Sequence, residues 1–499
     1  MSIRPSMAFI DSTAINVALP ALQASFHATV VDLQWVVESY GLLLAALILV
    51  GGSLGDLFGR RLIFVAGVSI FAVASVGCGF ASNIHPMIIA RSIQGVGAAL
   101  LVPGSLAIIS TSFDEKSRGQ AIGTWSGFTA ITTAIGPVLG GWLVEHASWR
   151  WVFFINLPLA AAVVAFSVWR IPESRSAGAG RIDWLGAILA TLGLGSLVTG
   201  FIESPNLGWG SPLVFGGLAV GVGCLIAFVF VEAASAAPML PLMLFKSHSF
   251  SGANLLTFFL YATIGIFFFL FPLNLIQVQR YSTTATGAAI LPLILLMFFL
   301  SRWSGGLVAR HGSRGPLIVG PLIVALGFAL FAVPSIGGGY WREFFPAMVV
   351  LGFGMALTVA PLTTVVMNSV NKDRVGTGSG INNAVARVAG VLAIAVLGIV
   401  MAKAFGSRLN YSLAHLVLPP AVLQELHANE IELAGLHVPA GLNPGTNTAI
   451  NESIGEAFVF GFRIVMLACA ALSLGSAAVA WLMIPKARDR SGLDPAGLS

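Results

Sequence analysis

Ionisable side chains inside long apolar stretches are the residues of this sequence most able to do chemistry. The first is Asp11, in F-I-D-S-T-A-I-N-V-A-L-P from Phe9 to Pro20. A carboxylate inside a membrane span costs about 2.5–3.5 kcal/mol on insertion scales, so it is expected to face a cavity or a partner. Such a group is a candidate proton carrier or cation contact. The pattern equally allows Asp11 to cap a short first helix near one membrane surface.

Glu38 is a second buried-acid candidate, in W-V-V-E-S-Y from Trp35 to Tyr40. It falls one to two turns inside the next apolar stretch. We expect it to face a central cavity and to bind a proton or a cation. The alternative is a residue that reaches the membrane surface, although Glu is shorter than Lys or Arg and reaches less far.

Arg91 lies in I-I-A-R-S-I-Q-G-V-G-A-A, from Ile88 to Ala99, and shares a helical face with Gln94. The residue pattern by itself allows a structural arginine that ties helices together through backbone carbonyls. A later apolar stretch also contains polar and charged residues, namely Asn382, Asn383 and Arg387. There Arg387 is a counter-ion for a carboxylate or an anionic cargo, or equally a structural ion-pair partner.

Aromatic side chains are dense from Phe258 to Phe271. Together with Trp125 and Phe128 they are candidates to line a cavity for flat hydrophobic cargo. The alternative, more common for such stripes, is a core or lipid-facing position.

The composition places most of this chain inside a membrane. Charged residues make up 9% of 499 and hydrophobic residues 57%, with a mean hydropathy of +0.92. A soluble domain carries about 25% charge. The net charge of +5 is scattered over loops, which gives no indication of nucleic-acid binding. The three cysteines fit neither a metal site nor a disulfide framework.

Signatures of ATP use and of catalysis are missing from the sequence. It contains no P-loop, no H-E-x-x-H, no nucleophile elbow in a plausible context and no selectivity-filter repeat. We therefore expect no enzyme activity and no cofactor. We also expect no cleavable signal peptide.

A transmembrane helix needs roughly 20 apolar residues, and on that basis the sequence predicts an all-α membrane protein with fourteen transmembrane helices. They are expected near 6–26, 34–55, 61–82, 86–111, 118–143, 150–171, 182–202, 211–232, 249–277, 284–309, 314–336, 344–369, 376–402 and 455–485. Sixteen of the 25 Lys and Arg residues then fall on one side and five on the other. The richer side is expected to be cytoplasmic, which places both termini there and the protein in the cell membrane.

The spans fall into two related halves. Residues 1–171 form one predicted six-helix bundle, and residues 248–490 form the other. Between them, 172–247 holds a linker and an inserted helical hairpin. Residues 403–454 form a long extracytoplasmic loop with an amphipathic piece at 421–435, and 491–499 form a cytoplasmic tail.

The best evidence for the repeat is the stretch G-S-L-G-D-L-F-G-R-R, from Gly52 to Arg61. Its glycines permit close approach of helix ends. Asp56 can pair with an arginine, and the two arginines hold the turn at the cytoplasmic side. A weaker copy runs from Gly305 to Arg314. The residues expected to form these conformational contacts are Gly52, Asp56, Gly59, Arg60 and Arg61 in the first copy, Gly312 and Arg314 in the second, and Arg118, which opens a later glycine-rich span.

That later span, Gly123 to Gly141, contains two pairs of glycines spaced four apart. Gly136, Pro137, Gly140 and Gly141 combine a helix-bending proline with surfaces for close helix contact. Together they predict a pivot. Plain helix packing is the alternative.

Four motifs resemble those of the major facilitator superfamily, in the expected order along essentially the whole chain. Gly52 to Arg61 matches its signature loop G-x-L-x-D-x-x-G-R-[KR] at every fixed position. D-x-T-x-x-N-V-A-L-P resembles the first-helix motif of its fourteen-helix drug:proton antiporter branch, which ties Asn16 to the Asp11 site. Arg91 begins R-x-x-x-G-x-G. The Gly-Pro and Gly-Gly core resembles the antiporter motif, with Thr132 in place of its first glycine.

This resemblance implies two six-helix bundles around a central site, with a two-helix insert. It also implies export of hydrophobic or cationic drugs and antibiotics in exchange for protons. The proton gradient then supplies the energy, the arginine tunes protonation of the acids, and the protein works as a monomer in the lipid bilayer. A proton-coupled carrier of one specific metabolite and a non-transporting membrane sensor are the remaining alternatives.

Overall fold

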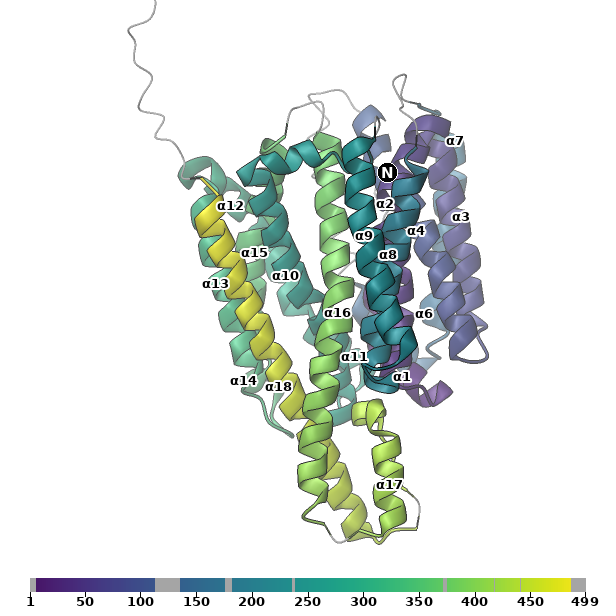
Figure 1. The fold of residues 1–499 in the computed structure, drawn as a ribbon, viewed down its shortest axis with the longest axis vertical. Helices are drawn as coiled ribbons and strands as arrows, with labels where there is room; N and C mark the ends of the chain where they lie inside the picture. Colours follow the sequence, from purple (N-terminus) through teal and green to yellow (C-terminus); the bar gives the residue numbers. More distant parts are fainter. Residues whose placement is uncertain are drawn as a thin grey trace, which may run out of the picture.

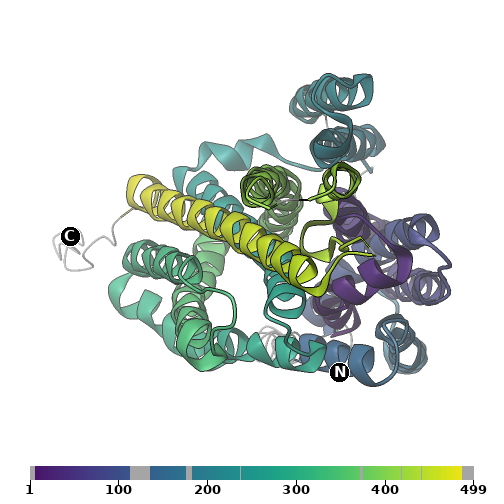
Figure 2. The same cartoon turned by 90° about the horizontal axis from the view of Figure 1, so that it is seen from below.

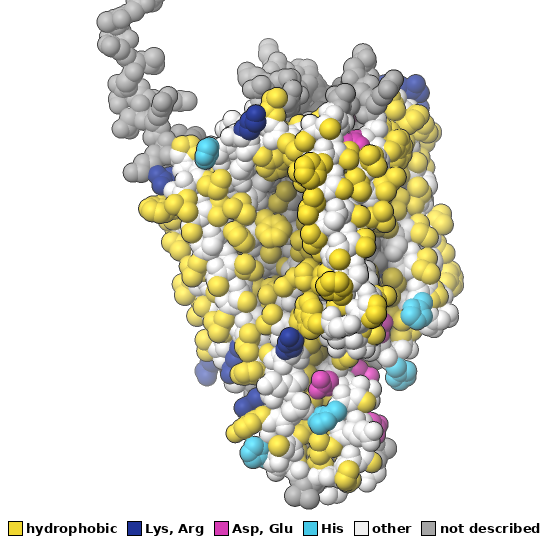
Figure 3. All heavy atoms as spheres, in the orientation of Figure 1, with side chains coloured by type: hydrophobic (Ala, Val, Ile, Leu, Met, Phe, Trp, Pro, Cys, Tyr) yellow, Lys and Arg dark blue, Asp and Glu magenta, His cyan; other side chains and the backbone are white. Residues whose placement is uncertain are grey.

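The computed structural model describes residues 6–112, 135–175, 182–235, 238–370, 375–416, 418–439 and 441–485, and within them the chain is helical without a β-strand. The helices stand side by side along one axis (Figure 1). Hydrophobic side chains cover the flank of the molecule, and charged ones gather toward its two ends (Figure 3). This is the arrangement that a lipid environment selects.

Twelve of the described helices are long and apolar enough to cross a membrane. The prediction of fourteen contained two more. One of them, 6–26, forms helix α1 (Ser6–Phe26). The other, 118–143, begins outside the described residues. Arg118, Trp125 and the predicted tail 491–499 also lie outside them.

The first group of helices comes from the N-terminal part of the chain. Gly59, with φ of 123°, separates two of its long helices, so the expected turn at Gly52 to Arg61 is a single residue within otherwise helical sequence. The group comprises α1, α2 (Val30–Phe58), α3 (Arg60–Gly79), α4 (Ile84–Ser112), a helix at 135–146, α6 (Trp151–Phe154) and α7 (Asn156–Arg170).

The second group comes from the C-terminal part. It comprises η1 (Leu242–Lys246), α10 (His248–Leu273), η2 (Asn274–Val278), α11 (Thr283–Ala289), α12 (Leu291–His311), α13 (Arg314–Phe331), α14 (Tyr340–Glu343), α15 (Phe345–Asn368), α16 (Val375–Leu413) and α18 (Pro444–Met483). Seen along the helix axes, the two groups lie on opposite sides of the molecule (Figure 2).

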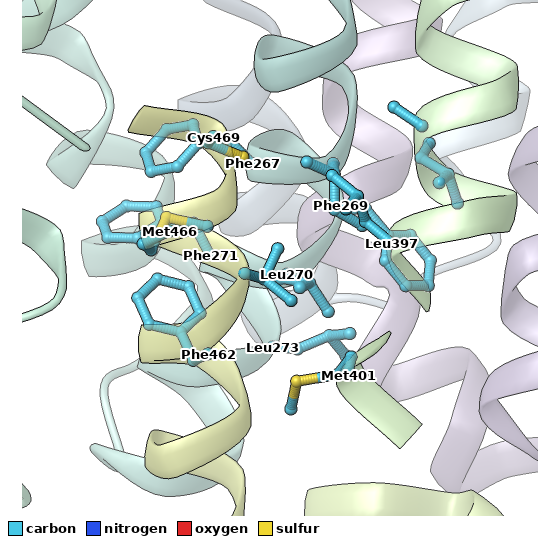
Figure 4. Close-up of a cluster of buried hydrophobic side chains, with 14 of the residues drawn as sticks. Phe267, Phe269, Leu270, Phe271, Leu273, Leu397, Met401, Phe462, Met466 and Cys469 are labelled. Atoms are coloured by element: carbon cyan, nitrogen blue, oxygen red, sulfur yellow. The ribbon is translucent and has the colours of Figure 1, made fainter. Parts of the chain in front are cut away.

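The aromatic stretch of α10 is part of the core of this second group. Phe267, Phe269 and Phe271 are fully buried. Figure 4 shows Phe267 and Phe271 on the side of α18, and Phe269 near Leu397 of α16. The prediction that this stretch lines a cargo cavity is therefore wrong for Phe267 and Phe271, because they pack against other apolar side chains, whereas Phe269 also borders a small cavity next to α16.

Two inserted helices, α8 (Trp184–Leu207) and α9 (Pro212–Ala234), stand outside both groups (Figure 2). α8 packs against α2 of the first group and α16 of the second. α9 packs on α8 and is largely exposed, with Phe215 and Phe230 each 70% accessible. The insert therefore lies across a line of contact between the two groups.

One end of the molecule is extended by the segment between α16 and α18. Residues 403–413 and 444–454, expected in a loop, are helical continuations of these two helices. Between them lie α17 (Pro420–Ala428) and η4 (Glu430–Gly435), within the segment expected to be amphipathic. We call this end the loop end (lower in Figure 1), and the opposite end, which carries Arg60 and Arg61, the arginine end.

Candidate functional site

Asp11 lies at the centre of a buried polar network. Its Oδ2 accepts a hydrogen bond from Nη1 of Arg91 at 2.6 Å. Its Oδ1 accepts from Nε2 of Gln94 and from Nδ2 of Asn156, both at 2.9 Å. Asp11 is 0% and Arg91 1% exposed. The carboxylate is thus paired, hydrogen-bonded at both oxygens and shielded from solvent.

The same network holds five helices of the first group together. Arg91 also donates from Nε to the carbonyl of Val36 at 3.0 Å, and its guanidinium lies 4.4 Å from the centre of the Tyr40 ring. The hydroxyl of Ser75 accepts from Gln94 at 2.8 Å and from Asn156 at 3.3 Å. Side chains of α1, α2, α3, α4 and α7 therefore meet here. Breaking one partner of such a buried ion pair costs about 3–5 kcal/mol.

Sequence analysis found part of this network. It placed Asp11, Arg91 and Gln94 as site residues, and the structure brings these three together. It tied Asn16 to Asp11, but the Asn16 amide donates to the Ser12 carbonyl one turn earlier at 3.2 Å. It missed Asn156, whose only signal is an amide within the apolar run that follows Trp151.

Glu38 is buried, and no described residue pairs with its carboxylate. It is 1% exposed, and neither carboxylate oxygen has a hydrogen-bond partner in the described part of the chain. Both oxygens of a buried carboxylate are costly to leave unpaired when the group is ionised. A protonated carboxyl avoids most of that cost, so this position favours holding a proton.

The neighbours of Glu38 show which way it faces. Gln34, one turn earlier, donates from Nε2 to the Ile394 carbonyl of α16 at 3.2 Å. Leu42, one turn later, packs with Val391 of α16 in a buried apolar cluster. Residues four apart share a helix face, so Glu38 faces α16.

We call this line of contact between α2 and α16 the seam, and α8 covers its outer side. Leu194 and Val198 of α8 belong to the cluster that holds Leu42. Nε1 of Trp35 donates to Oε1 of Glu203 on α8 at 2.7 Å. Glu38 was expected in a central cavity or at the membrane surface. In the structure it lies buried between the two groups of helices, in the seam.

Arg387 lies on the α16 side of the same seam. Gly398 lies against Gln34 and Gly380 against Leu49, which defines an antiparallel register. The two contacts put residues 391 to 394 level with Glu38, so Arg387 is four to seven residues away, or about 6–11 Å along the helix axis.

The two asparagines predicted beside Arg387 differ in their surroundings. Asn382 donates to Oδ1 of Asn254 at 3.1 Å and to Oγ1 of Thr257 at 2.7 Å, both on α10. It therefore ties two helices of the second group together. Asn383 is exposed and donates to the Ser379 carbonyl.

At the arginine end, the Gly52 to Arg61 stretch forms local contacts. Nη2 of Arg60 lies 2.7 Å from Oδ1 of Asp56, one turn earlier. The carboxylate of Glu173, after α7, accepts from the backbone N–H groups of Arg61 and Leu62 at 3.0 and 3.1 Å. Glu173 thus caps the start of α3, a role that the sequence analysis missed. Gly52 lies against Pro103 of α4.

The second copy of this stretch is simpler. Gly312 has φ of 75°, and Nη2 of Arg314 donates to the Trp481 carbonyl of α18. Ala309 stands where the first copy has Asp56, so it offers no carboxylate at that position.

Toward the loop end, the predicted glycine pivot packs against both groups. A Cβ at Gly136 would meet Thr13 of α1, and one at Gly140 would meet Ala14. A Cβ at Gly141 would meet the backbone of Thr283, at the start of α11 in the second group. Reciprocally, Gly287 of α11 lies against the Pro137 carbonyl.

Hydrogen bonds reinforce this contact. Oγ1 of Thr283 donates to the Gly141 carbonyl at 2.8 Å, and Oε2 of Glu145 accepts from the Thr284 backbone N–H at 3.0 Å. Hydrogen bonds from Thr284 and Ser282 hold the pKa of the exposed Glu145 below its usual value. The two groups are therefore joined at the loop end through the helix 135–146 and α11.

A protein-family comparison identifies the fold. The model of the Major Facilitator Superfamily matches residues 6–394. The chain belongs to the major facilitator superfamily. Its two groups of helices, with the seam between them, are the two halves of a major facilitator transporter, and α8 and α9 are an addition to them.

Individual relatives are similar over nearly the whole chain. The Multidrug resistance protein Stp of Mycobacterium tuberculosis is 34% identical, covering 98% of this chain and 91% of the relative. The Tetracenomycin C resistance and export protein of Streptomyces glaucescens is 33% identical, covering 95% and 88%. Among solved structures, a bacterial homologue of the human lysosomal transporter Spinster matches with a TM-score of 0.64 at 17% identity, covering 97% and 95%. The last comparison supports the fold alone.

Proposed function

We propose that this major facilitator transporter exports drug-like or antibiotic-like small molecules in exchange for protons, and that Glu38 carries the proton. The cargo class follows from the relatives, whose names describe multidrug resistance and tetracenomycin C export. The observation that carries the coupling site is the burial of Glu38 in the seam with both oxygens unpaired in the described chain.

Asp11 is the weaker candidate for the proton. Protonating it would weaken its bond with Arg91 and leave that arginine buried without its counter-charge, at 1% exposure. Asp11 and Arg91 therefore act as a structural pair that keeps the first half rigid. Among the described residues Glu38 has no such partner, so its protonation breaks no ion pair there.

The position of Glu38 lets its proton respond to movement. In a rocking-bundle transporter the halves tilt against each other around the central site. Because Glu38 faces α16 across the seam, tilting changes whether its carboxyl contacts apolar helix or solvent. A closed seam favours the neutral acid, and a seam opened toward water on the arginine side favours release of the proton.

The exchange cycle follows from these preferences. We place the arginine end in the cytoplasm, because Lys and Arg are concentrated on that side. Cargo enters from that end while Glu38 loses its proton there. Cargo then leaves at the loop end, where Glu38 takes up a proton from outside. Each charge moved inward through 100 mV supplies about 2.3 kcal/mol, enough for a useful cargo gradient with one or two protons.

Vesicle transport tests this function. Inverted vesicles energised by respiration and loaded with a pH-sensitive dye are challenged with a panel of lipophilic cations and neutral antibiotics. We expect cargo-induced proton release with the wild-type protein and none with Glu38→Gln. Glu232→Gln on α9 is the control, because that carboxylate is also buried but lies outside the seam.

The outcomes separate the alternatives. Unchanged proton release in Glu38→Gln would overturn the assignment to Glu38. No response of the wild-type protein to the broad panel, with response to a single metabolite, would establish a narrow carrier. No transport at all by folded protein would favour a sensor.

A further inference from the structure

A small cavity lies in the seam on the loop-end side of Glu38. It is about 10 Å³, measured as the space open to the centre of a water molecule, which is the lower limit for holding one water. Side chains of α2, α8, α10, α16 and η4 line it, including Gln34, Pro205, Gly398, Ile431 and Leu433. Both halves, the insert and the segment between α16 and α18 thus meet around one space.

Gln34 connects this cavity with Glu38. The two residues are four apart on the α16-facing side of α2, so their side chains are neighbours, with about 5–6 Å between Cβ atoms. Gln34 is 4% exposed and is the polar side chain of the cavity lining. An amide can donate to and accept from a water but cannot itself pass a proton on without becoming an imidic acid, so Gln34 is placed to hold a water that delivers the proton to the carboxyl.

The η4 segment roofs the cavity and spans both halves. Leu433 is 2% exposed and adopts φ of 52°, an unusual conformation for a non-glycine residue that packing must hold. Nε2 of Gln23 on α1 donates to the Glu432 carbonyl at 3.0 Å. Nε2 of Gln277 on η2 donates to Oε1 of Gln23 at 2.7 Å. Because these bonds join α1, η2 and η4, tilting of the halves must disturb the roof.

The charged residues around η4 favour the presence of a proton near the cavity. Glu430 and Glu432 lie in the first turn of η4. The charged groups on α2 and on the elements packed against it are, among the described residues, Asp32 and Asp56 on α2, Asp11 on α1, Arg60 and Arg61 on α3, Arg91 on α4, Glu203 on α8, Arg387, Lys403 and Arg408 on α16, and Glu430 and Glu432 on η4. Asp11 and Arg91 neutralise each other, and Asp56 pairs with Arg60 at the far end. On the loop-end side of Glu38, acidic residues outnumber basic ones: Asp32, Glu203, Glu430 and Glu432 lie there with Lys403 and Arg408, while Arg408 pairs with Glu456 and Glu432 lies 3.7 Å from His437.

We propose that this cavity is the entry route for protons from the loop end to Glu38, with Gln34 holding the water that carries the proton and η4 as its gate. This inference rests on the proposed function and assigns a role to the segment between α16 and α18. If the cavity is the route, proton uptake depends on the charge of a group introduced at η4. If η4 is only a structural cap, proton uptake depends only on the size of that group.

The test attaches a charged group to η4 beside the cavity. Ile431→Cys, partly exposed at the cavity, is modified from the loop end with thiol reagents of similar size that attach either a quaternary ammonium or a sulfonate. Ala428→Cys, exposed on α17 outside the cavity lining, is the matched control. Cys224 is replaced by serine in both, because the other two cysteines are buried. Cargo-driven proton flux is recorded before and after modification.

We expect the cationic adduct of the Ile431→Cys variant to slow proton flux by about threefold or more relative to the anionic one, and acidifying the loop-end solution to restore the rate. Neither adduct of the Ala428→Cys variant should do so. Equal inhibition by both adducts of the Ile431→Cys variant, or no inhibition by either, would overturn the route. Absence of cargo-driven proton flux in the unmodified protein would overturn the proposed function itself, and the route with it.

A second variant guards against misfolding of the cysteine mutants. Gln34→Leu removes the group that holds the water and keeps the volume of the side chain similar. We expect its efflux rate to match that of the wild type at acidic external pH and to fall below it at neutral pH, with internal pH held constant. A uniform loss at every external pH would contradict a role of Gln34 in delivering the proton.

Discussion

The guanidinium of Arg91 lies 2.6 Å from the carboxylate of Asp11, and both side chains are sealed from solvent. Because Gln94 and Asn156 complete the hydrogen bonding of Asp11, this pair forms the centre of the first half. Glu38, in contrast, lies outside that network and faces the second half. The two acids of the first half thus have different roles in our account.

Asp11→Ala should destabilise the protein strongly. It leaves Arg91 buried and uncompensated, which costs about 3–5 kcal/mol, whereas Asp11→Asn keeps the shape and part of the hydrogen bonding and costs less. Thermal unfolding in detergent, followed by intrinsic fluorescence, measures both. A stable Asp11→Asn variant that transports cargo but moves no protons would reassign the coupling to Asp11.

Gly141→Ala should loosen the contact between the halves at the loop end. Its new methyl group would meet the backbone of Thr283, and overpacking of this kind costs about 1–3 kcal/mol. We expect lower thermal stability and easier access of thiol reagents to a cysteine introduced at Thr284. Gly223→Ala on α9 is the control, because a Cβ there has open space around it. Equal thermal stability and equal thiol access in Gly141→Ala and Gly223→Ala would show that the contact between Gly141 and Thr283 does not close the loop end.

Glu173→Ala should affect stability more than Asp56→Asn. Glu173 caps two backbone N–H groups of α3, and loss of a helix cap costs about 0.5–2 kcal/mol. The partly exposed Asp56–Arg60 pair, one turn apart, contributes only about 0.3–0.5 kcal/mol. Melting temperatures of the two variants compare these costs. A larger loss for Asp56→Asn would mean that Asp56 makes further structural contacts.

Stability at low pH should depend on Glu145. Hydrogen bonds from Thr284 and Ser282 lower the pKa of Glu145 in the folded protein. A depressed pKa contributes stability above the pKa of the unfolded chain, near 4.3 for Glu, and this contribution is lost as pH falls through the folded value. Glu145→Gln should therefore melt earlier than wild type at pH 7, and the gap should close toward pH 3. A gap that stays constant with pH would contradict this assignment.

Much of the fold was predictable because its signals are local. Apolar stretches of about 20 residues, separated by charged turns, determine a helical membrane protein whatever the tertiary contacts are. The pairing of Asp11 with Arg91 and Gln94 was also accessible, since unusual polar residues inside spans must find partners. The four motifs then indicated the family that the comparison identified.

The rest depends on contacts between distant segments. Nothing in W-V-V-E-S-Y shows that Glu38 faces α16, because that depends on how α2 rotates against α16. Asn156 and Glu173 lack a motif, and their roles arise from packing between helices far apart in sequence. The aromatic stretch of α10 could not be assigned to core or cavity until its neighbours on α18 and α16 were known.

The ratio of protons to cargo tests the central claim most directly. Purified protein is reconstituted in liposomes, and proton and cargo fluxes are recorded together for wild type, Glu38→Gln and Glu232→Gln. We predict that Glu38→Gln still exchanges cargo for cargo but moves no protons with it, while Glu232→Gln keeps the wild-type ratio. An unchanged ratio in Glu38→Gln would show that the proton travels on another group.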